Sequence, residues 1–229
     1  MGGLPTLWVG RMRVVSARAG RWVLATLVAA GTIAAIEALV AEGDEFADRR
    51  NAMVDALVAN GIISDARVIG AMRMVPRHLF VSEAQRDLAY RDQALPIAHG
   101  QNLYAPSIIG IMVEALAPEA SARVLEIGAG CGYQTAVLAK LVRHVYSVEP
   151  NAELAVSAQA RLRELGITNA TVKQGDPSAG WPEQAPFDVI VVNAAAEDVP
   201  PALLDQLAEG GRMVIALIEE GWGQKLYLI

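Results

Sequence analysis

The 229-residue chain contains one cysteine and three histidines, and this scarcity excludes several kinds of site. A single thiol, Cys131, can form neither a disulfide within the chain nor a zinc site built from several thiolates. His78, His99 and His144 lie far apart and show no H-E-x-x-H spacing, so we expect no metal centre. Lysine and arginine number 19 against 25 aspartate and glutamate, which disfavours a surface devoted to duplex nucleic acid.

The first 43 residues differ in composition from the rest of the chain. Arginines between Arg11 and Arg21 precede an uncharged run of 15 residues, Trp22 to Ile36, which Glu37 interrupts. Such a pattern is typical of a signal peptide or membrane anchor, but the run is shorter than the roughly 20 residues that span a bilayer. The extension 1–43 is therefore a helical or disordered addition, a signal or anchor, or an extra packed helix; an over-long start, with Met53 as the true first residue, is also open.

From residue 44 onward the sequence has the pattern of a folded domain. Hydrophobic residues make up 53% of the chain, enough to build a sizeable core, and one α/β domain commonly fills about this length. We expect residues 44–118 to form a subdomain of helices and loops. Its predicted elements are a helix over 47–59, a helix capped by Ser64 or Asp65 that runs to Met74, an ordered loop segment over 75–106, and a helix that Pro106 opens.

Strand and helix patterns alternate over residues 119–229, which is typical of a parallel sheet. Predicted strands cover 123–127, 144–148, 170–173, 187–192, 211–217 and 224–229, and predicted helices cover 132–142, 151–165 and 200–208. The fold class is therefore α/β: a Rossmann-like, doubly wound, mostly parallel sheet preceded by N-terminal helices.

The residues that carry chemistry gather where the first predicted strand meets its helix. The strand ends at Ile127 and continues as Gly128-Ala129-Gly130-Cys131-Gly132, a turn whose missing Cβ atoms let the backbone lie against a ligand. Its spacing differs from the G-x-G-x-x-G of dinucleotide sites, and Glu126 favours a cationic ligand over a nicotinamide. By itself this turn is weak evidence for nucleotide binding.

Two further acidic residues end the next two predicted strands. Glu149 lies 21 positions after Gly128, where a carboxylate accepts hydrogen bonds from both ribose hydroxyls. Asp176 follows the third strand and can accept a hydrogen bond from an adenine amino group. Each residue alone has an ordinary explanation as a solvated strand end. Together with the glycine turn they predict an adenosine that lies across the carboxyl edge of the sheet.

Short motifs outside the turn narrow the assignment further. They include Met-Val-Pro-Arg-His-Leu-Phe-Val at 74–81, Ala-Tyr-Arg-Asp-Gln-Ala-Leu-Pro-Ile at 89–97, Gly100-Gln101, Gly175-Asp176, Gly180-Trp181-Pro182, the segment 185–188, the three alanines 194–196, and Gly210-Gly211-Arg212. From about residue 49 to the end, the chain resembles the protein-L-isoaspartate O-methyltransferases. These are S-adenosylmethionine-dependent enzymes with the Rossmann-like fold of class I methyltransferases.

The resemblance implies a protein-repair enzyme that methylates the free carboxylate of isoaspartyl residues in damaged polypeptides. Because S-adenosylmethionine is a cytosolic metabolite, we expect a cytoplasmic protein, with membrane tethering or export as the alternative if the N-terminal apolar run is an anchor or signal. We expect a monomer, and the acidic charge balance predicts no nucleic-acid partner. Such a reaction needs no acid–base pair, because the donor is already activated and a carboxylate is ionised at neutral pH. The predicted cofactor-binding residues are Gln101, Asn102, Leu103, Glu126, Gly128, Ala129, Gly130, Gly132, Glu149, Pro150, Asp176 and Pro177.

Several departures from the family pattern concern the substrate side. Tyr104 stands at the position of the family's active-site serine and is the predicted catalytic position. Pro177 replaces a glycine and removes a backbone donor, and Asn193 stands where threonine is usual. The chain also ends at Ile229, before a final strand that the family has, so we expect a truncated C-terminal strand. The alternative function is a divergent relative that binds S-adenosylmethionine but methylates another substrate, or is inactive and acts by binding a partner.

Overall fold

The computed structural model describes residues 45–219 and 223–229, and these belong to a compact unit that spans Glu45–Ile229. The predicted extension 1–43 lies outside the described residues, and its nature stays a prediction. Within the described ranges, no helix combines the length and the apolar character that crossing a bilayer requires.

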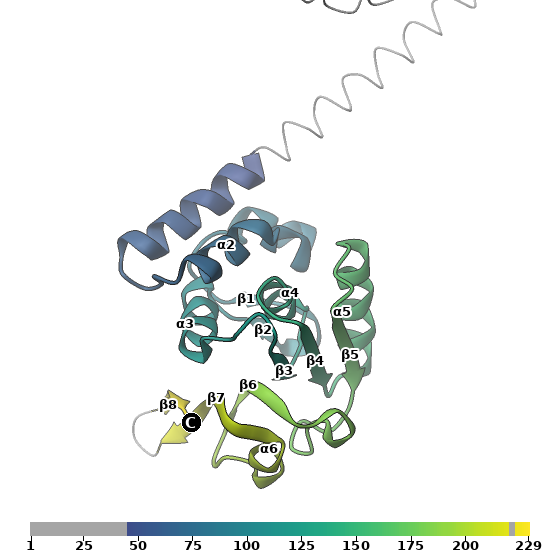
Figure 1. Ribbon diagram of the computed structural model, residues 1–229. Helices are drawn as coiled ribbons and strands as arrows, with labels where there is room; N and C mark the ends of the chain where they lie inside the picture. The colour runs from purple at the N-terminus through teal and green to yellow at the C-terminus, as the bar shows by residue number, and fades with distance from the viewer. Residues whose placement is uncertain (1–44, 220–222) are drawn as a thin grey trace, which may run out of the picture. The chain divides into compact units, whose positions relative to one another are not determined.

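A six-stranded sheet lies at the centre of this unit, in the order β5-β4-β3-β6-β7-β8 (Figure 1). The strands are β3 (Arg123–Ile127), β4 (His144–Glu149), β5 (Ala170–Gln174), β6 (Phe187–Ala196), β7 (Leu207–Glu219) and β8 (Gly223–Leu228). The first five are parallel and β8 runs antiparallel to β7, which confirms the predicted mostly parallel sheet. The chain winds outward from β3 in one direction and then returns to β6 on its other side, so the crevice for ligands is expected at the carboxyl ends of these two strands.

Both faces of β3 are buried, because helices and loops cover the sheet on each side. Val124 belongs to a core cluster that includes residues of helices α3 (Pro106–Leu116) and α4 (Tyr133–Ala139). Leu125 belongs to a second cluster that includes Leu203 of helix α6 (Pro201–Asp205). In Figure 1, α3 and α4 accordingly lie on the opposite side of the sheet from α6. This double burial explains the nearly continuous apolar sequence of the strand.

Helix boundaries follow the capping residues in the sequence. Helix α2 (Ala66–Met74) begins after Asp65, whose side chain accepts a hydrogen bond from the Arg67 N–H. Helix α5 (Ala152–Glu164) begins after Asn151, whose side chain accepts from the Leu154 N–H. Proline opens α3, at the one helical position where its missing N–H costs nothing. The described part of the first helix covers 45–59, in agreement with the predicted segment 47–59.

Two predicted helices are too long. The helix predicted over 132–142 ends at Ala139, because the Lys140 and Leu141 N–H groups bond to carbonyls three residues back. The helix predicted over 200–208 is α6, which ends at Asp205, and Leu207 already pairs with Phe187 as the start of β7. Strands β6 and β7 are correspondingly longer than predicted, and their parallel pairing includes two irregular steps.

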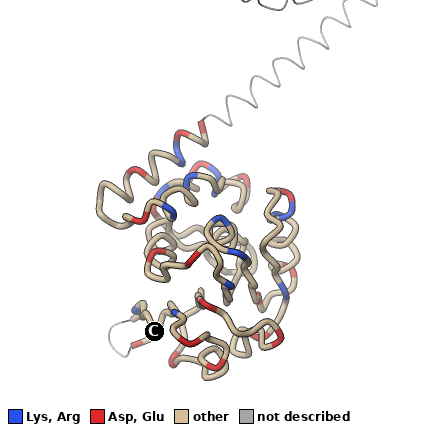
Figure 2. Tube along the Cα trace, in the orientation of Figure 1, with Lys and Arg blue, Asp and Glu red and all other residues tan. Residues whose placement is uncertain are grey.

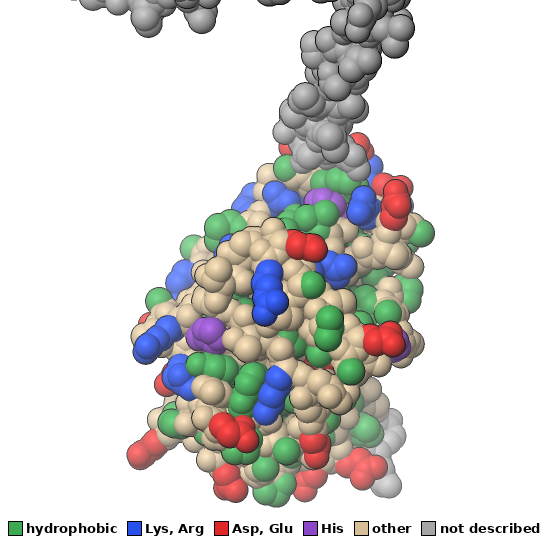
Figure 3. Space-filling view, turned by 90° about the vertical axis from the view of Figure 1, so that its right-hand side faces the viewer, with side chains coloured by type: hydrophobic (Ala, Val, Ile, Leu, Met, Phe, Trp, Pro, Cys, Tyr) green, Lys and Arg blue, Asp and Glu red, His purple; other side chains and the backbone are tan. Residues whose placement is uncertain are grey.

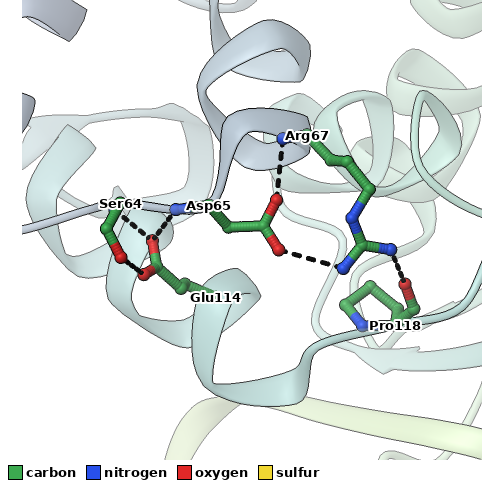
Figure 4. A network of polar contacts seen from close by, with 5 residues as sticks. All are labelled: Ser64, Asp65, Arg67, Glu114 and Pro118. Carbon is green, nitrogen blue, oxygen red and sulfur yellow. Dashed lines mark hydrogen bonds and ion pairs between the residues drawn. The ribbon is translucent and has the colours of Figure 1, made fainter.

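A polar network joins α2 to α3 (Figure 4). The Glu114 carboxylate on α3 accepts hydrogen bonds from the Ser64 N–H at 2.7 Å, the Ser64 hydroxyl at 2.6 Å and the Asp65 N–H at 3.2 Å. Arg67 completes the network by bonding the Asp65 carboxylate at 2.9 Å and the Pro118 carbonyl at 2.8 Å. The N–H of the N-cap Asp65, which a helix start leaves without an intrahelical partner, and that of the preceding Ser64 are thereby paired with a carboxylate on the neighbouring helix.

Charge is unevenly distributed along the described chain. The stretch 174–211, which includes β6 and α6, contains seven acidic residues and no lysine or arginine, as the red segments around α6 in Figure 2 show. On the face turned to the viewer in Figure 3, basic, acidic and hydrophobic side chains are instead interspersed. The region around α6 therefore presents no basic patch for a phosphate backbone.

Candidate active site

The glycine turn after β3 adopts a backbone conformation that requires glycine. Gly130 and Gly132 have φ values of 53° and 89°, in the left-handed region. A Cβ atom on Gly130 would lie 3.3 Å from the Ile97 side chain, and one on Gly132 would lie 3.3 Å from Ala158 on α5. The turn is thus packed closely between α5 and the loop that carries Ile97.

That loop belongs to the segment predicted as ordered but irregular, and the structure confirms the prediction. It consists of three short 3-10 helices, Arg77–Phe80, Glu83–Leu88 and Ala98–Gly100, and of a two-residue antiparallel pair between β1 (Leu95–Pro96) and β2 (Asn102–Leu103). The fully buried Arg77 joins its two ends, donating to the Ala89 carbonyl at 2.8 Å and to the Tyr104 carbonyl at 2.6 Å. Its guanidinium also lies 4.8 Å from the centre of the Tyr133 ring.

Two cavities lie between this loop and the carboxyl edge of the sheet. The first has a volume of about 50 Å³ and the second about 380 Å³. A ligand pocket for a drug-sized molecule commonly measures about 300–1,000 Å³, so only the second accommodates a nucleoside. The first has room for one or two groups of about the size of a water molecule. The two cavities share the lining residues Gln101, Asn102, Tyr104, Gly128 and Asn193.

Glu149 lines the second cavity and is fully buried at the end of β4. Its carboxylate accepts hydrogen bonds from the Gly130 N–H at 2.8 Å, the Asn151 N–H at 3.0 Å and the Gln101 amide at 3.3 Å. The side chain thereby connects the glycine turn, the loop and the start of α5. Because a carboxylate has about four acceptor sites, one is left for a ligand hydroxyl, and a second becomes free when the Gln101 amide, the longest of the three contacts, releases its bond.

Glu126 lies beneath the glycine turn and not in the wall of either cavity. It is fully buried, and its carboxylate accepts hydrogen bonds from the Thr135 and Ser147 hydroxyls and from the Asn193 amide. Burial raises the pKa of Glu126 to about 7, against these three hydrogen bonds, which lower it. The position suits a side chain that supports the turn, and its predicted contact with the cofactor stays a prediction.

Tyr104 stands between the two cavities. Its hydroxyl donates to the backbone carbonyl of Asn193 at 3.2 Å, while its own carbonyl is fixed by Arg77. Burial raises the pKa of Tyr104, so the phenol is neutral near pH 7. The Asn193 amide in turn donates to the Gly128 carbonyl at 3.0 Å. The end of β6, the glycine turn and the loop are therefore connected through side chains that face the cavities.

Nine of the twelve predicted cofactor-binding residues line one cavity or the other. The remaining three are Glu126, Gly132 and Asp176. Asp176 is exposed, and hydrogen bonds from the hydroxyl and N–H of Ser178 lower its pKa. Sequence reasoning missed Gln134, which lines the first cavity, and Gln224 of β8, which lines the second. The place of Gln134, directly after Gly132-Tyr133, could have indicated it, whereas no local pattern points to Gln224.

Among the side chains that the structure describes, no group of three or more His, Cys, Asp and Glu residues could hold a metal ion. The walls of the two cavities provide hydrogen-bonding groups, apolar side chains and the buried Glu149 carboxylate.

Comparisons with known proteins agree on one family. A sequence model described as protein-L-isoaspartate(D-aspartate) O-methyltransferase matches residues 48–229. The protein-L-isoaspartate O-methyltransferase of Roseiflexus sp. (strain RS-1) is 51% identical over 171 residues, which cover 75% of this chain and 78% of the relative. Protein-L-isoaspartate O-methyltransferase 1 of Syntrophobacter fumaroxidans is 44% identical over 184 residues, which cover 80% of this chain and 86% of the relative.

Solved structures that resemble this chain include members of the same family. A protein-L-isoaspartate O-methyltransferase superposes with a TM-score of 0.72 at 28% identity, over 78% of this chain and 59% of that chain. A Plasmodium falciparum structure described as a beta-aspartate methyltransferase in complex with S-adenosyl-L-homocysteine superposes with a TM-score of 0.68 at 26% identity. This second alignment covers 79% of this chain and 88% of that chain.

Proposed function

Because the chain belongs to the protein-L-isoaspartate O-methyltransferase family, we propose that it methylates the free carboxylate of L-isoaspartyl residues in damaged polypeptides. The methyl donor of this family is S-adenosyl-L-methionine, and the chain is a carboxyl O-methyltransferase. The observation that carries the proposal is the pair of cavities with shared walls at the carboxyl ends of β3, β4 and β6, where a doubly wound sheet binds its ligand.

The residues of the site fit this cofactor. The second cavity has the volume for an adenosine, and the buried Glu149 carboxylate in its wall can accept hydrogen bonds from ribose hydroxyls. Pro150 and Pro177 provide apolar surface on the side of the same cavity where we place the adenine. The backbone of the glycine turn, free of side chains at Gly128 and Gly130, lets a ligand approach the strand end.

Transfer of the methyl group requires alignment and exclusion of water, not proton transfer. The cofactor, when bound, supplies a methyl group activated by a sulfonium. A substrate carboxylate, with a pKa of about 4, is ionised at neutral pH and attacks the methyl carbon directly. The new C–O bond forms as the C–S bond breaks, and the electron pair of that bond stays on sulfur. The apolar side chains of Ile97, Leu103 and Ile109 in the first cavity exclude water from this region.

The methyl ester then closes spontaneously to a succinimide, which can hydrolyse to a normal aspartyl residue. In this scheme Tyr104 is one of the loop residues that line both cavities, and we assign its neutral hydroxyl as a donor that orients the incoming carboxylate. To do so, the hydroxyl must exchange its bond to the Asn193 carbonyl for one to the substrate. We also propose a cytoplasmic location, because S-adenosylmethionine is a cytosolic metabolite.

One observation favours a second candidate function. The Tyr104 ring occupies the wall between the cavities and is held there at its hydroxyl and at its carbonyl, so it can obstruct the substrate. If the ring obstructs the substrate, the protein would bind the cofactor without turnover and act by binding a partner.

An isoaspartyl peptide supplied with methyl-labelled S-adenosylmethionine separates the two candidates, with the same peptide containing a normal aspartate as the control. We expect label in a base-labile ester of the isoaspartyl peptide alone. Tight cofactor binding without transfer to either peptide would support the second candidate and refute the first.

A further inference from the structure

Arg77 is the one fully buried basic side chain within the described ranges. None of the ion pairs among the described residues involves it, so its charge lies in the interior without a carboxylate partner. An arginine stays charged in proteins, and a buried charge without an opposite partner is costly. The contacts that Arg77 does make therefore indicate what the residue provides.

The guanidinium of Arg77 joins two backbone positions that are far apart in the sequence. Its Nε donates to the Ala89 carbonyl at 2.8 Å, and its Nη2 donates to the Tyr104 carbonyl at 2.6 Å. We call the segment 89–104 between these two positions the strap. The strap residues that line the cavities are Ile97, Gln101, Asn102, Leu103 and Tyr104. One side chain thus fixes both ends of the segment that forms the loop-side wall of the site.

The third contact of Arg77 is the ring of Tyr133, the first residue of α4. The guanidinium carbon lies 4.8 Å from the ring centre, and Nη1 is buried without a hydrogen-bond partner among the described residues. A cation above an aromatic face is attracted by the ring. Tyr133 directly follows Gly132, so this contact connects the strap to the glycine turn.

The other polar contacts between the strap and the sheet edge are longer. Nε2 of Gln101 lies 3.3 Å from the Glu149 carboxylate, and the Tyr104 hydroxyl lies 3.2 Å from the Asn193 carbonyl. The proposed ligands take over both of these bonds. Arg77 lines neither cavity and bonds only to backbone carbonyls of the strap, so its bonds persist when a ligand enters.

We propose that Arg77 is a positioning residue for methyl transfer: its two carbonyl bonds hold the ends of the strap and thereby set where the Tyr104 hydroxyl meets the substrate carboxylate. The proposal rests on the proposed function, which assigns that hydroxyl to the carboxylate. Only arginine has a planar fork of donors that reaches two carbonyls at once; a lysine carries a point charge instead. A displacement of about 1 Å at a reacting group can lower a rate about a hundredfold, so small movements of the strap matter.

Hydrogen exchange of the full chain without ligand tests whether Arg77 holds the strap. Arg77→Lys keeps the charge and loses the fork, and Arg77→Met removes both. In each variant we expect the backbone amides of residues 95–104 to exchange at least about tenfold faster, the effect of losing one hydrogen bond to a charged group. The amides of β3 and β4 should keep their rates.

Arg123→Met is the matched control. Arg123 also donates to two backbone carbonyls, those of Gln184 and Pro186, and lies 4.8 Å from the centre of the Tyr146 ring. It stands at the start of β3, at the opposite end of the strand from the cavities. Its substitution should leave the exchange of the strap unchanged.

Turnover of an isoaspartyl peptide supplies a readout that a merely structural role would not move. Below the denaturation midpoint of each variant, kcat of Arg77→Lys should be about tenfold to a hundredfold lower. Its KM for the peptide should stay within about threefold, because alignment of the bound carboxylate is lost and not its capture. Arg123→Met should keep both constants. A raised KM with unchanged kcat would overturn the positioning role.

The outcomes separate this inference from the function on which it rests. Exchange that accelerates equally in the strap and in the sheet would mean that Arg77 supports the core as a whole, and unchanged exchange of the strap would mean that other contacts hold it. Failure of both Arg77 variants to fold, beside a folded Arg123→Met, would likewise assign Arg77 to the core. Each of these results overturns the proposal and leaves the proposed function intact. Absence of methyl transfer by the unaltered protein would instead overturn the proposed function, on which the exchange measurement does not depend.

Discussion

Removal of the Glu149 carboxylate is the substitution that should most directly weaken cofactor binding. In Glu149→Ala the ligand loses the acceptor for its ribose hydroxyls, and three N–H donors, those of Gly130, Asn151 and Gln101, lose their partner. Hydrogen bonds to charged groups contribute about 1.5–3 kcal/mol each, so the loss of two gives about 3–6 kcal/mol. This corresponds to an affinity at least about a hundredfold weaker.

Calorimetric titration with S-adenosyl-L-homocysteine and with 5′-methylthioadenosine measures this effect. Both ligands carry the ribose, so both affinities should fall together. Glu149→Gln keeps one acceptor oxygen and should lose less, about tenfold. Glu164→Gln, an exposed substitution on α5, is the matched control and should bind as the unaltered protein does.

The denaturation midpoint of each variant must be measured beside its affinity, because Glu149 is fully buried. A folded Glu149→Ala protein whose dissociation constants stay within a factor of about three would refute the ribose assignment, since that corresponds to less than half of one such hydrogen bond.

Substitutions at three further positions test other parts of the account. Tyr104→Ser should raise kcat/KM on an isoaspartyl peptide, because it removes the ring between the cavities and keeps a hydroxyl donor for the carboxylate, whereas Tyr104→Phe keeps the ring and loses the donor and should not. An unchanged or lower rate for the serine variant would exclude Tyr104 as the obstruction. Glu114→Gln should lower the unfolding free energy by only about 1 kcal/mol, because the carboxylate is partly exposed and screened. Burial raises the pKa of Glu114, but hydrogen bonds from Ser64 and Asp65 outweigh this and lower it. Its stabilisation is therefore present above about pH 4.5 and is lost as the pH falls through the lowered pKa, so urea unfolding should show a larger deficit of the variant at pH 7 than at acidic pH. The pH dependence expected for Glu126 is the opposite. Burial raises its pKa to about 7, so its contribution to the unfolding free energy is full below about pH 4.5 and is lost as the pH rises through 7. Relative to Glu126→Gln, the unaltered protein should therefore lose on the order of 2 kcal/mol of unfolding free energy between pH 5 and pH 8, and parallel pH dependences would contradict the raised pKa.

The central part of the fold could be predicted because local signals and burial agree there. Strand β3 has the predicted limits, since apolar residues fill both of its faces and the glycine turn ends it. The end of β6 could not be placed in this way. Asn193 and the alanines that follow have no strand periodicity, and the strand extends to Ala196 because Ala195 and Ala196 pair with β7 beyond an irregular step. Pairing between distant segments, not propensity, decides such a boundary.

Much of the site could be predicted from topology, because parallel strands place their carboxyl ends at one edge. This is why Glu149 and the glycine turn are adjacent in the structure, as their sequence positions indicated. Side-chain direction is harder to predict for a strand that is buried on both faces. Alternation along β3 places Glu126 on the face of Val124, toward Thr135 of α4, and hence away from the cavities. Gln224 reaches the second cavity only through the antiparallel pairing of β8 with β7, which no local pattern reveals.

A crystal structure of the protein with S-adenosyl-L-homocysteine tests the central claim most directly. We predict the ribose hydroxyls within hydrogen-bond distance of the Glu149 carboxylate, the adenine beside Pro177, and the thioether directed toward Tyr104. Density for the ligand elsewhere on the molecule, or a second cavity without ligand at saturating concentration, would contradict the assignment of this sheet edge as the methyl-donor site.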